Sequence, residues 1–427
     1  MIKILKYEEV PHEEIFARVQ PQADVEGIVS SIIAEVRARG DAALFEYCAK
    51  FDKANLDSLL VSEAEIEAAI AAVEPEFLRI LTEAKENITA FHEKQVRSGF
   101  EIRKDNGVIM GQKITPVDKA GLYVPGGTAA YPSTVLMDAI PAKIAGCGEI
   151  VMVTPPAADG SVNSAILAAA HIAGVDKIFK VGGAQAIAAL AYGTESIPKV
   201  DKIVGPGNAF VAEAKKQVFG AVSIDMIAGP SEILIVADSK SNPRYVAADL
   251  LSQAEHDVLA SAVLLTDSND LALAVQAQLE AQIPLLEREE IAGKSIDANG
   301  KIIVAKDLQT VIAIANEIAP EHLELCVDNP FDYLASIRHA GSIFMGRNCP
   351  EALGDYLAGP NHTLPTSGTA KFSSPLSVDD FIKKTQYTYF PAPALAEVAE
   401  DVAFFAKKEG LTAHAKSAVV RLEENDE

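Results

Sequence analysis

The stretch EIVMVTPPAADGSVNSAILAAAHIAGVDKIFKVGG, residues 149–183, contains one complete strand–helix–strand pattern. Its first part, EIVMVTPP, is a short β-rich run that ends at two prolines. SAILAAAHIAGV has helical composition, and DKIFKVGG returns to a short apolar run that ends at two glycines. A helix of about a dozen residues between two short strands is typical of a βαβ unit with parallel strands. The stretch therefore predicts a parallel α/β sheet.

The same alternation continues to about residue 238 and resumes at residue 260. The second part contains ASAVLLTD, predicted helices over 269–290 and 307–318, and the short runs KIIVA, LELCV and GSIFMG. We therefore predict the α/β fold class, with two Rossmann-like parallel units. Their similar size suggests an internal duplication, although the two parts share no visible sequence identity.

Two further regions have helical periodicity without the strand pattern. Over residues 23–95 apolar residues recur at three- and four-residue spacing, and Ser62 and Glu65 match a capping box. The C-terminal end predicts two helices separated at Gly410, with Thr412 capping the second. This C-terminal arm is too small to hold a core of its own, so we expect it to pack on a partner subunit.

Composition excludes several classes of protein. The chain has 427 residues and a formal net charge of −23, which disfavours nucleic acid or an anionic membrane as a partner. The four cysteines lie far apart without a CxxC pair, so we expect a reducing compartment rather than a disulfide framework. We see neither a signal peptide nor an apolar run that could span a membrane, and we expect a cytoplasmic protein.

Glycine-rich loops follow several predicted strands of the first α/β part: VGGAQA, VGPGNA and AGPSE, besides TPP. Ligands of a parallel sheet bind beyond the carboxyl ends of its strands, where such loops let backbone amides approach a phosphate. The match to a dinucleotide fingerprint is poor, because GPGNAF has Phe210 at its last position. The loop over 121–134 carries Tyr123, which can stack on a base or ribose, although an exposed linker is the simpler interpretation.

DLLSQAEHD, residues 249–257, places Gln253 and His256 on one face of a predicted helix, with Asp249 one turn earlier. Imidazole with oxygen ligands suits zinc. Gln is an uncommon zinc ligand, so a helix cap or a buried hydrogen bond is the more common explanation of this pair.

Other candidate groups occur later in the chain. Glu321 and His322 are adjacent and offer a carboxylate and an imidazole for proton transfer, although a polar surface turn is the commoner explanation. Asp355 beside a glycine is alone an ordinary turn former. His414 in the first turn of the last helix is unfavourable when charged, a penalty that metal binding removes. Cys349 has no local pattern that would activate a thiol.

In their order and spacing, these motifs together resemble histidinol dehydrogenase: GLYVPGG, GGAQAIAALAYGT, VGPGN, AGPSE, DLLSQAEHD, PEHLEL, GDYLAGPNHTLPT and EGLTAHAKS. The resemblance covers residues 15–421. It implies an enzyme of the last step of histidine biosynthesis, which oxidises L-histidinol to L-histidine through the aldehyde and reduces two NAD⁺ in sequence. It also implies one zinc per subunit and a homodimer in which the C-terminal arm of one subunit completes the active site of the other.

Residue roles follow from the resemblance alone. It implies a zinc site of Gln253, His256, Asp355 and the partner subunit's His414. It implies catalytic roles for Glu321 and His322, with substrate also contacting the zinc ligands, Ser231 and the partner subunit's Glu409. It implies an NAD site lined by Tyr123, Gln185 and Asn208.

The expected domains are an N-terminal arm (1–20), a first α/β domain with the metal and catalytic residues (21–122 and 235–376), a second α/β domain with the NAD-binding loops (123–234), and the helical C-terminal arm (377–427). Two alternative functions stay open on the residues: an NAD-dependent aldehyde dehydrogenase with a cysteine nucleophile, and a zinc-dependent imidazole- or amine-binding protein without redox chemistry.

Overall fold

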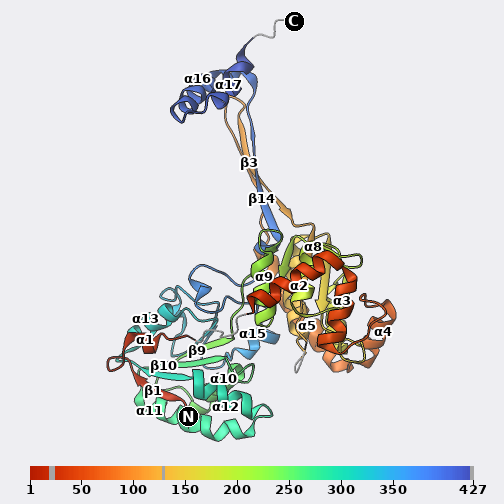
Figure 1. Ribbon diagram of the computed structural model, residues 1–427. Coiled ribbons are helices and arrows are strands. Elements are labelled where there is room, and N and C mark those ends of the chain that lie inside the picture. Colours follow the sequence, from red (N-terminus) through yellow and green to blue (C-terminus); the bar gives the residue numbers. More distant parts are fainter. Residues whose placement is uncertain (19–24, 127–129, 424–427) are drawn as a thin grey trace. The chain divides into compact units, whose positions relative to one another are not determined.

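The computed structural model describes residues 1–18, 25–126 and 130–423 (Figure 1). The chain forms two compact units. The first unit comprises residues 1–95 and 117–381, and the second comprises residues 96–116 and 382–427. None of the described helices is both long enough and apolar enough to cross a membrane.

A five-stranded parallel sheet occupies one part of the first unit. Its strands, in spatial order, are β6 (Lys177–Lys180), β5 (Glu149–Thr154), β4 (Lys119–Tyr123), β7 (Lys202–Val204) and β8 (Ser223–Ile224). The connecting helices are α6 (Pro132–Ala145), α7 (Ser164–Ala173), α8 (Gly183–Tyr192) and α9 (Ala209–Val218). Side chains on both faces of β5 are buried, which explains why these strands are continuously apolar rather than alternating.

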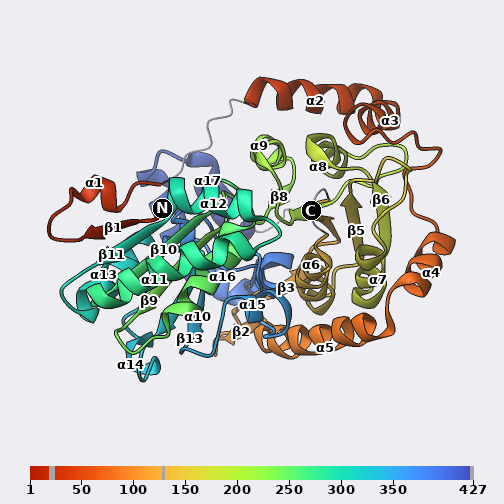
Figure 2. The same ribbon diagram turned by 90° about the horizontal axis from the view of Figure 1, so that it is seen from below.

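A six-stranded parallel sheet occupies the rest of the first unit. Its strands are β1 (Lys3–Lys6), β11 (Lys301–Val304), β10 (Ser261–Thr266), β9 (Glu232–Ala237), β12 (His322–Cys326) and β13 (Ser342–Met345), in spatial order. Its helices are α1 (His12–Ile15), α10 (Pro243–Ala254), α11 (Asn269–Gln282), α12 (Glu289–Asn299), α13 (Leu308–Ile318), α14 (Phe331–Leu334) and α15 (Ala352–Tyr356). Helices α10, α11 and α12 cover one face of the sheet, and α13 and α1 pack on the other (Figure 2).

The two sheets have the same strand order. Numbered along the chain within each sheet, both are ordered 3-2-1-4-5, and β1 is an additional strand beside β11. This is the order of a doubly wound Rossmann-like sheet. The predicted α/β class with two parallel units is confirmed.

The N-terminal helices pack against the helices that flank the five-stranded sheet. They are α2 (Glu26–Arg39), α3 (Asp41–Tyr47), α4 (Glu63–Ala72) and α5 (Pro75–His92). Helix α2 contacts α8 and α9, α4 contacts α7, and α5 contacts α6. Their apolar faces pack against the helices around β4–β7, whereas the sequence predicts residues 21–122 as part of the domain with the metal and catalytic residues. The expected arm over residues 1–20 also contributes β1 to the six-stranded sheet.

The second unit contains an antiparallel sheet and two helices. Its sheet is ordered β14 (Ile382–Tyr389), β3 (Ile109–Pro116) and β2 (Phe100–Arg103), and its helices are α16 (Ala392–Lys408) and α17 (Thr412–Val419). The β2–β3 hairpin turns at Asn106–Gly107, where Gly107 has a φ of 83°. The predicted C-terminal arm thus starts with a strand, and its pairing partner is a hairpin nearly 300 residues earlier in the chain.

Candidate active site

Helix α10 ends where strands β10 and β12 begin. Asn242 accepts a hydrogen bond from the backbone N–H of Arg244 and Pro243 occupies the first turn, so the helix starts as its sequence predicts. Because α10 connects the carboxyl end of β9 to the amino end of β10, its last turn lies at the amino ends of the strands. Gln253 and His256 are therefore located at this amino edge, and so are Ser231, just before β9, and His322, the first residue of β12.

The amide of Gln253 has a fixed orientation. Its Nε2 donates a 2.6 Å hydrogen bond to Oε1 of Glu351, and both side chains are buried. The other carboxylate oxygen of Glu351 accepts a 2.8 Å hydrogen bond from Ser252. Gln253 Oε1 is buried and has no hydrogen-bond partner among the described residues. An unsatisfied buried carbonyl is costly, so this oxygen fits a site where a cation supplies the missing interaction.

Asp355 lies among three histidines. Its Oδ1 is 3.3 Å from Nδ1 of His362. Burial alone would raise the pKa of Asp355, but the hydrogen bond from His362 and the proximity of His322 and His256 lower it to about 2. Burial lowers the pKa of His256, and the charge of Asp355 only partly opposes this effect. An ionised carboxylate beside a neutral imidazole is the protonation state that metal binding requires.

Two acidic side chains and one histidine converge closely enough for a metal ion, and His256 is not part of this group. One ligand atom from each of His322, Glu351 and Asp355 lies within 4.8 Å of the others. Together with Gln253 Oε1, this gives imidazole nitrogen, carboxylate oxygen and amide oxygen as available donors, a set that zinc accepts. Asp249 is not part of this group, because it hydrogen-bonds Glu324, and burial raises its pKa to about 6.

Glu321 and His322 are buried, not part of a surface turn. His322 Nδ1 donates a 2.9 Å hydrogen bond to the carbonyl of Glu232, and the N–H of Glu232 donates a 2.8 Å bond to Oε2 of Glu321. Because Nδ1 donates this hydrogen bond, Nε2 is the ring atom left for a ligand; it is buried, lies 3.9 Å from Oε1 of Glu351 and has no hydrogen-bond partner among the described residues. Burial raises the pKa of Glu321 well above its usual value, and the nearby charges of Glu232 and Asp355 act in the same direction. The pair therefore offers two proton acceptors.

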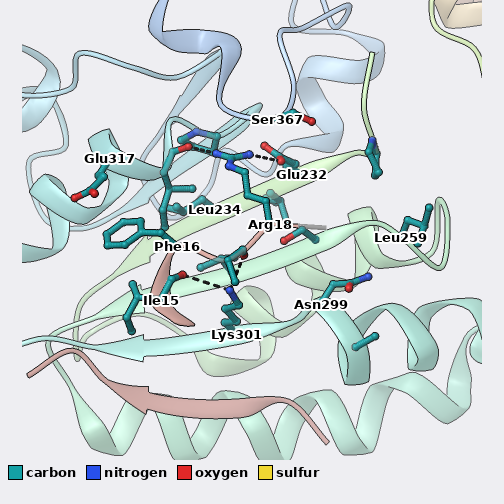
Figure 3. Close-up of a pocket in the computed structure, with 18 of the residues that line it drawn as sticks. Ile15, Phe16, Arg18, Glu232, Leu234, Leu259, Asn299, Lys301, Glu317 and Ser367 are labelled. Carbon is teal, nitrogen blue, oxygen red and sulfur yellow. Dashed lines mark hydrogen bonds and ion pairs between the residues drawn. The ribbon is translucent and has the colours of Figure 1, made fainter. Parts of the chain in front are cut away.

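A cavity of about 540 Å³ lies on the other side of Glu232 (Figure 3). Two of its three cationic side chains, those of Arg18 and Lys301, are already paired, and Lys371 is the third. Arg18 binds Glu232 and the carbonyl of Ile318, and Lys301 Nζ donates to the carbonyls of residues 14, 15 and 17. None of the zinc-site residues lines this cavity. The cavity is connected to the candidate site through Glu232, which forms part of the cavity wall and also hydrogen-bonds Glu321 and His322.

Three residues lie at the carboxyl edge of the five-stranded sheet, as expected for a nucleotide site. The hydroxyl of Tyr123, at the end of β4, accepts a 3.1 Å hydrogen bond from the N–H of Gly183. Gln185 is buried in the first turn of α8. Asn208 caps α9: its Oδ1 accepts hydrogen bonds from the N–H groups of residues 210 and 211, and its NH₂ group takes no part in the cap. Tyr123 is a buried strand residue, so the linker interpretation is wrong.

Residues 361–363 connect the two sheets. His362 Nε2 is 3.3 Å from the hydroxyl of Thr134, and Thr363 donates a 3.0 Å hydrogen bond to Asp138. Both partners lie on α6, beside the nucleotide loops, while His362 also contacts Asp355. The two halves of the candidate site are thus joined within the first unit.

Neither Glu351 nor His362 is among the site residues predicted from the sequence. Glu351 is four residues before Asp355 at the start of α15, so both lie one helical turn apart on the same face. That spacing is the signal that could have identified it. Glu409 and His414 belong to the second unit, where both are exposed in the single chain.

Nucleotide-type loops at one sheet and a buried imidazole–carboxylate group at the other define an α/β enzyme of the oxidoreductase type. The family model for histidinol dehydrogenase matches residues 17–422. A histidinol dehydrogenase of Clostridium acetobutylicum is 56% identical over 399 residues, covering 93% of each chain. That of Lactococcus lactis is 52% identical over 421 residues, covering 98% of each. The crystal structure of histidinol dehydrogenase from Elizabethkingia anophelis has a TM-score of 0.92 at 40% identity and covers 98% of this chain and 97% of that one.

The chain belongs to the histidinol dehydrogenase family. This is a family of NAD-linked oxidoreductases that catalyse the final step of histidine biosynthesis. The resemblance inferred from the motifs is confirmed. Burial raises the pKa of Cys48 to about 12 and of Cys147 to about 11, which argues against either thiol as a nucleophile, whereas Cys349, the thiol considered from the sequence, is only partly buried.

Proposed function

We propose that this enzyme oxidises L-histidinol to L-histidine through L-histidinaldehyde, with two NAD⁺ reduced in sequence. The observation that carries the proposal is a pair of buried atoms, Gln253 Oε1 and His322 Nε2, which have no hydrogen-bond partner among the described residues and lie beside Asp355 or Glu351. Gln253 Oε1 is suited to bind a cation, and His322 Nε2 is suited to accept a proton. A metal-assisted alcohol oxidation requires both functions.

A zinc ion would be held by Gln253, His256, Asp355 and the partner subunit's His414. When bound, it supplies a positive centre that orients the imidazole and amine of the substrate. The hydrogen bond from Gln253 to Glu351 supports this set, because it fixes the amide so that Oε1 is the free atom. The neutral state favoured for His256 supports it as well.

His322 Nε2 accepts the proton of the alcohol in the first oxidation, while NAD⁺ takes the hydride. Glu321 then accepts a proton from the water that adds to the aldehyde. His322 returns its proton to the aldehyde oxygen, which completes the hydrate, and it then accepts a hydroxyl proton of that hydrate as the second hydride leaves for a second NAD⁺. A carboxyl group with a raised pKa suits proton transfer near neutral pH better than an ordinary surface glutamate does.

We place NAD at the carboxyl edge of the five-stranded sheet, against Tyr123, Gln185 and Asn208. The free NH₂ group of Asn208 and the N-terminus of α9 favour a pyrophosphate there. Ser231 is a substrate contact in this proposal, because it precedes β9 at the same amino edge as His322.

The enzyme is a homodimer in this proposal, and the second unit of each chain completes the partner's site with Glu409 and His414. Two features of the second unit support an intersubunit role. Its apolar cluster contains little besides Ala403, Ala406 and Ala415, and helix α16 exposes Phe404 and Phe405 at 63% and 67%. Exposed aromatic side chains next to so small a core are typical of a surface that another chain covers. Free thiols at all four cysteines fit a cytoplasmic location.

Product identification tests the proposed reaction. Purified enzyme is incubated with L-histidinol and excess NAD⁺, and the products are identified by mass spectrometry. L-histidine should be the end product. Accumulation of L-histidinaldehyde would show that the second oxidation belongs to another enzyme, and unchanged histidinol would support the binding-protein alternative.

A further inference from the structure

An ion pair lies fully buried beneath the loop that leads to Asn208. Lys215 of α9 and Asp225, just after β8, form this pair with their side chains 2% and 1% exposed. No role was assigned to either residue from the sequence. The pair is the most deeply buried of the ion pairs in the described part of the chain.

Both members of the pair bind the same loop residue. Lys215 Nζ donates a 2.9 Å hydrogen bond to the carbonyl of Gly205, and the N–H of Gly205 donates a 2.8 Å bond to Oδ2 of Asp225. Gly205 has a φ of 113°, and a Cβ at this position would lie 2.2 Å from the carbonyl oxygen of Tyr123. The pair thus holds both polar backbone groups of a residue that lies tightly against the end of β4.

The energetics indicate a role beyond stability. Taking two charges out of water costs several kcal/mol per ion, and an apolar pair of similar volume often stabilises a fold equally well. What an apolar pair cannot do is hold the N–H and the C=O of Gly205 at fixed positions. Residues 205–208 lead directly into the cap of α9, so fixing Gly205 fixes the start of that helix and the side chain of Asn208.

We propose that Lys215 and Asp225 are positioning residues for the NAD-binding loop, which they hold in its binding geometry without contacting NAD themselves. This inference rests on the proposed NAD site. It assigns the function of the pair to nucleotide affinity and not to zinc or substrate binding.

The experiment compares Lys215→Met, Asp225→Asn and the double variant Lys215→Met/Asp225→Leu with the wild-type enzyme. NADH affinity is measured by fluorescence titration, with zinc content, histidinol KM and Tm measured in parallel. The single variants should bind NADH about tenfold or more weakly, since small displacements of a binding loop are costly, and their zinc content and histidinol KM should be unchanged. The double variant should be more stable than either single variant, because it has no unpaired buried charge, yet its NADH affinity should stay low.

Lys202→Met is the matched control. It removes a partly buried Lys–Asp pair, Lys202 at the amino end of β7 with Asp380, whose side chains are 8% and 27% exposed and which lies away from the nucleotide loops. It should lower Tm without changing NADH affinity. The inference is overturned if NADH affinity follows Tm across all four variants, or if the single variants bind NADH as wild type does. Failure of the wild-type enzyme to bind NADH would instead refute the proposed NAD site.

Discussion

Gln253 Nε2 and Glu351 Oε1 are 2.6 Å apart and form a hydrogen bond. The other end of this buried amide, Gln253 Oε1, has no hydrogen-bond partner among the described residues. An amide can present either its oxygen or its NH₂ group to a neighbour, and only the oxygen can bind a cation. While Glu351 is ionised it selects the oxygen, because a carboxylate can accept the hydrogen bond but cannot donate one; burial raises the pKa of Glu351 to about 7. A glutamate therefore determines whether a glutamine can act as a metal ligand.

Replacing Glu351 with Ala should weaken zinc binding by about 10- to 100-fold, since nothing would then orient the Gln253 amide. Zinc affinity is measured by competition with a chromogenic chelator. Glu351→Gln is the matched variant, and it should retain much of the affinity because its own oxygen can accept the bond from Gln253. Wild-type zinc affinity in Glu351→Ala would contradict the orienting role.

Replacing Glu321 with Gln should separate the two oxidations. If Glu321 takes the proton from water, the variant should lose about 10²- to 10⁴-fold in the oxidation of histidinaldehyde and far less in that of histidinol to the aldehyde. The two rates are measured by supplying each compound separately. His322→Asn is the comparison, since it should impair both steps. Equal losses on both substrates in Glu321→Gln would remove the water-activating role.

Asp138 should make stability depend on pH. Burial and the nearby charge of Asp225 raise the pKa of Asp138 to about 7 in the folded chain, while the unfolded value is about 3.9. Between these values the folded state keeps a proton that the unfolded state has released, so this group's contribution to stability falls as the pH rises. Asp138→Asn removes this pH dependence. The Tm of the variant minus the Tm of the wild type should therefore be more positive at pH 8 than at pH 5.

Asp159→Asn is the control for this prediction. Hydrogen bonds from Ser161 lower the pKa of Asp159, so its ionisation does not change between pH 5 and pH 8. Its Tm relative to wild type should be the same at both pH values. A pH-independent Tm difference for Asp138→Asn would show that Asp138 is ionised in the folded state at pH 5.

Mixing two inactive variants should restore activity if subunits share sites. His256→Ala disables the first unit and His414→Ala disables the second. After subunit exchange, half of the randomly formed dimers are mixed, and each mixed dimer has one complete site, so about a quarter of wild-type activity is expected. Each variant exchanged with itself is the control. Absence of recovery, with mixed dimers demonstrated, would mean that His414 acts within its own chain.

Local patterns in the sequence were sufficient to predict the main elements. The predicted capping box of Ser62 and Glu65 is present in the structure, because such a cap depends on residues within one turn. Thr412 was expected to cap the last helix, but it is the first helical residue, and Leu411 precedes it without a side-chain cap.

Long-range arrangement could not be predicted in the same way. The pairing of β14 with β3 joins segments that lie far apart in the sequence, and no local pattern specifies that register. The proposed NAD site follows the general rule that parallel sheets bind ligands at the carboxyl ends of their strands. Glu321 and His322 lie instead at the amino end of β12, where α10, with Gln253 in its last turn, ends just before His256.

The most direct test of the proposed reaction is the number of NADH molecules formed per L-histidinol consumed, run to completion with and without a zinc chelator. Two NADH per histidinol, lost on chelation and restored by added zinc, is the predicted result. One NADH per histidinol would contradict the second oxidation and the role of Glu321, and full activity in the chelated enzyme would contradict the zinc site.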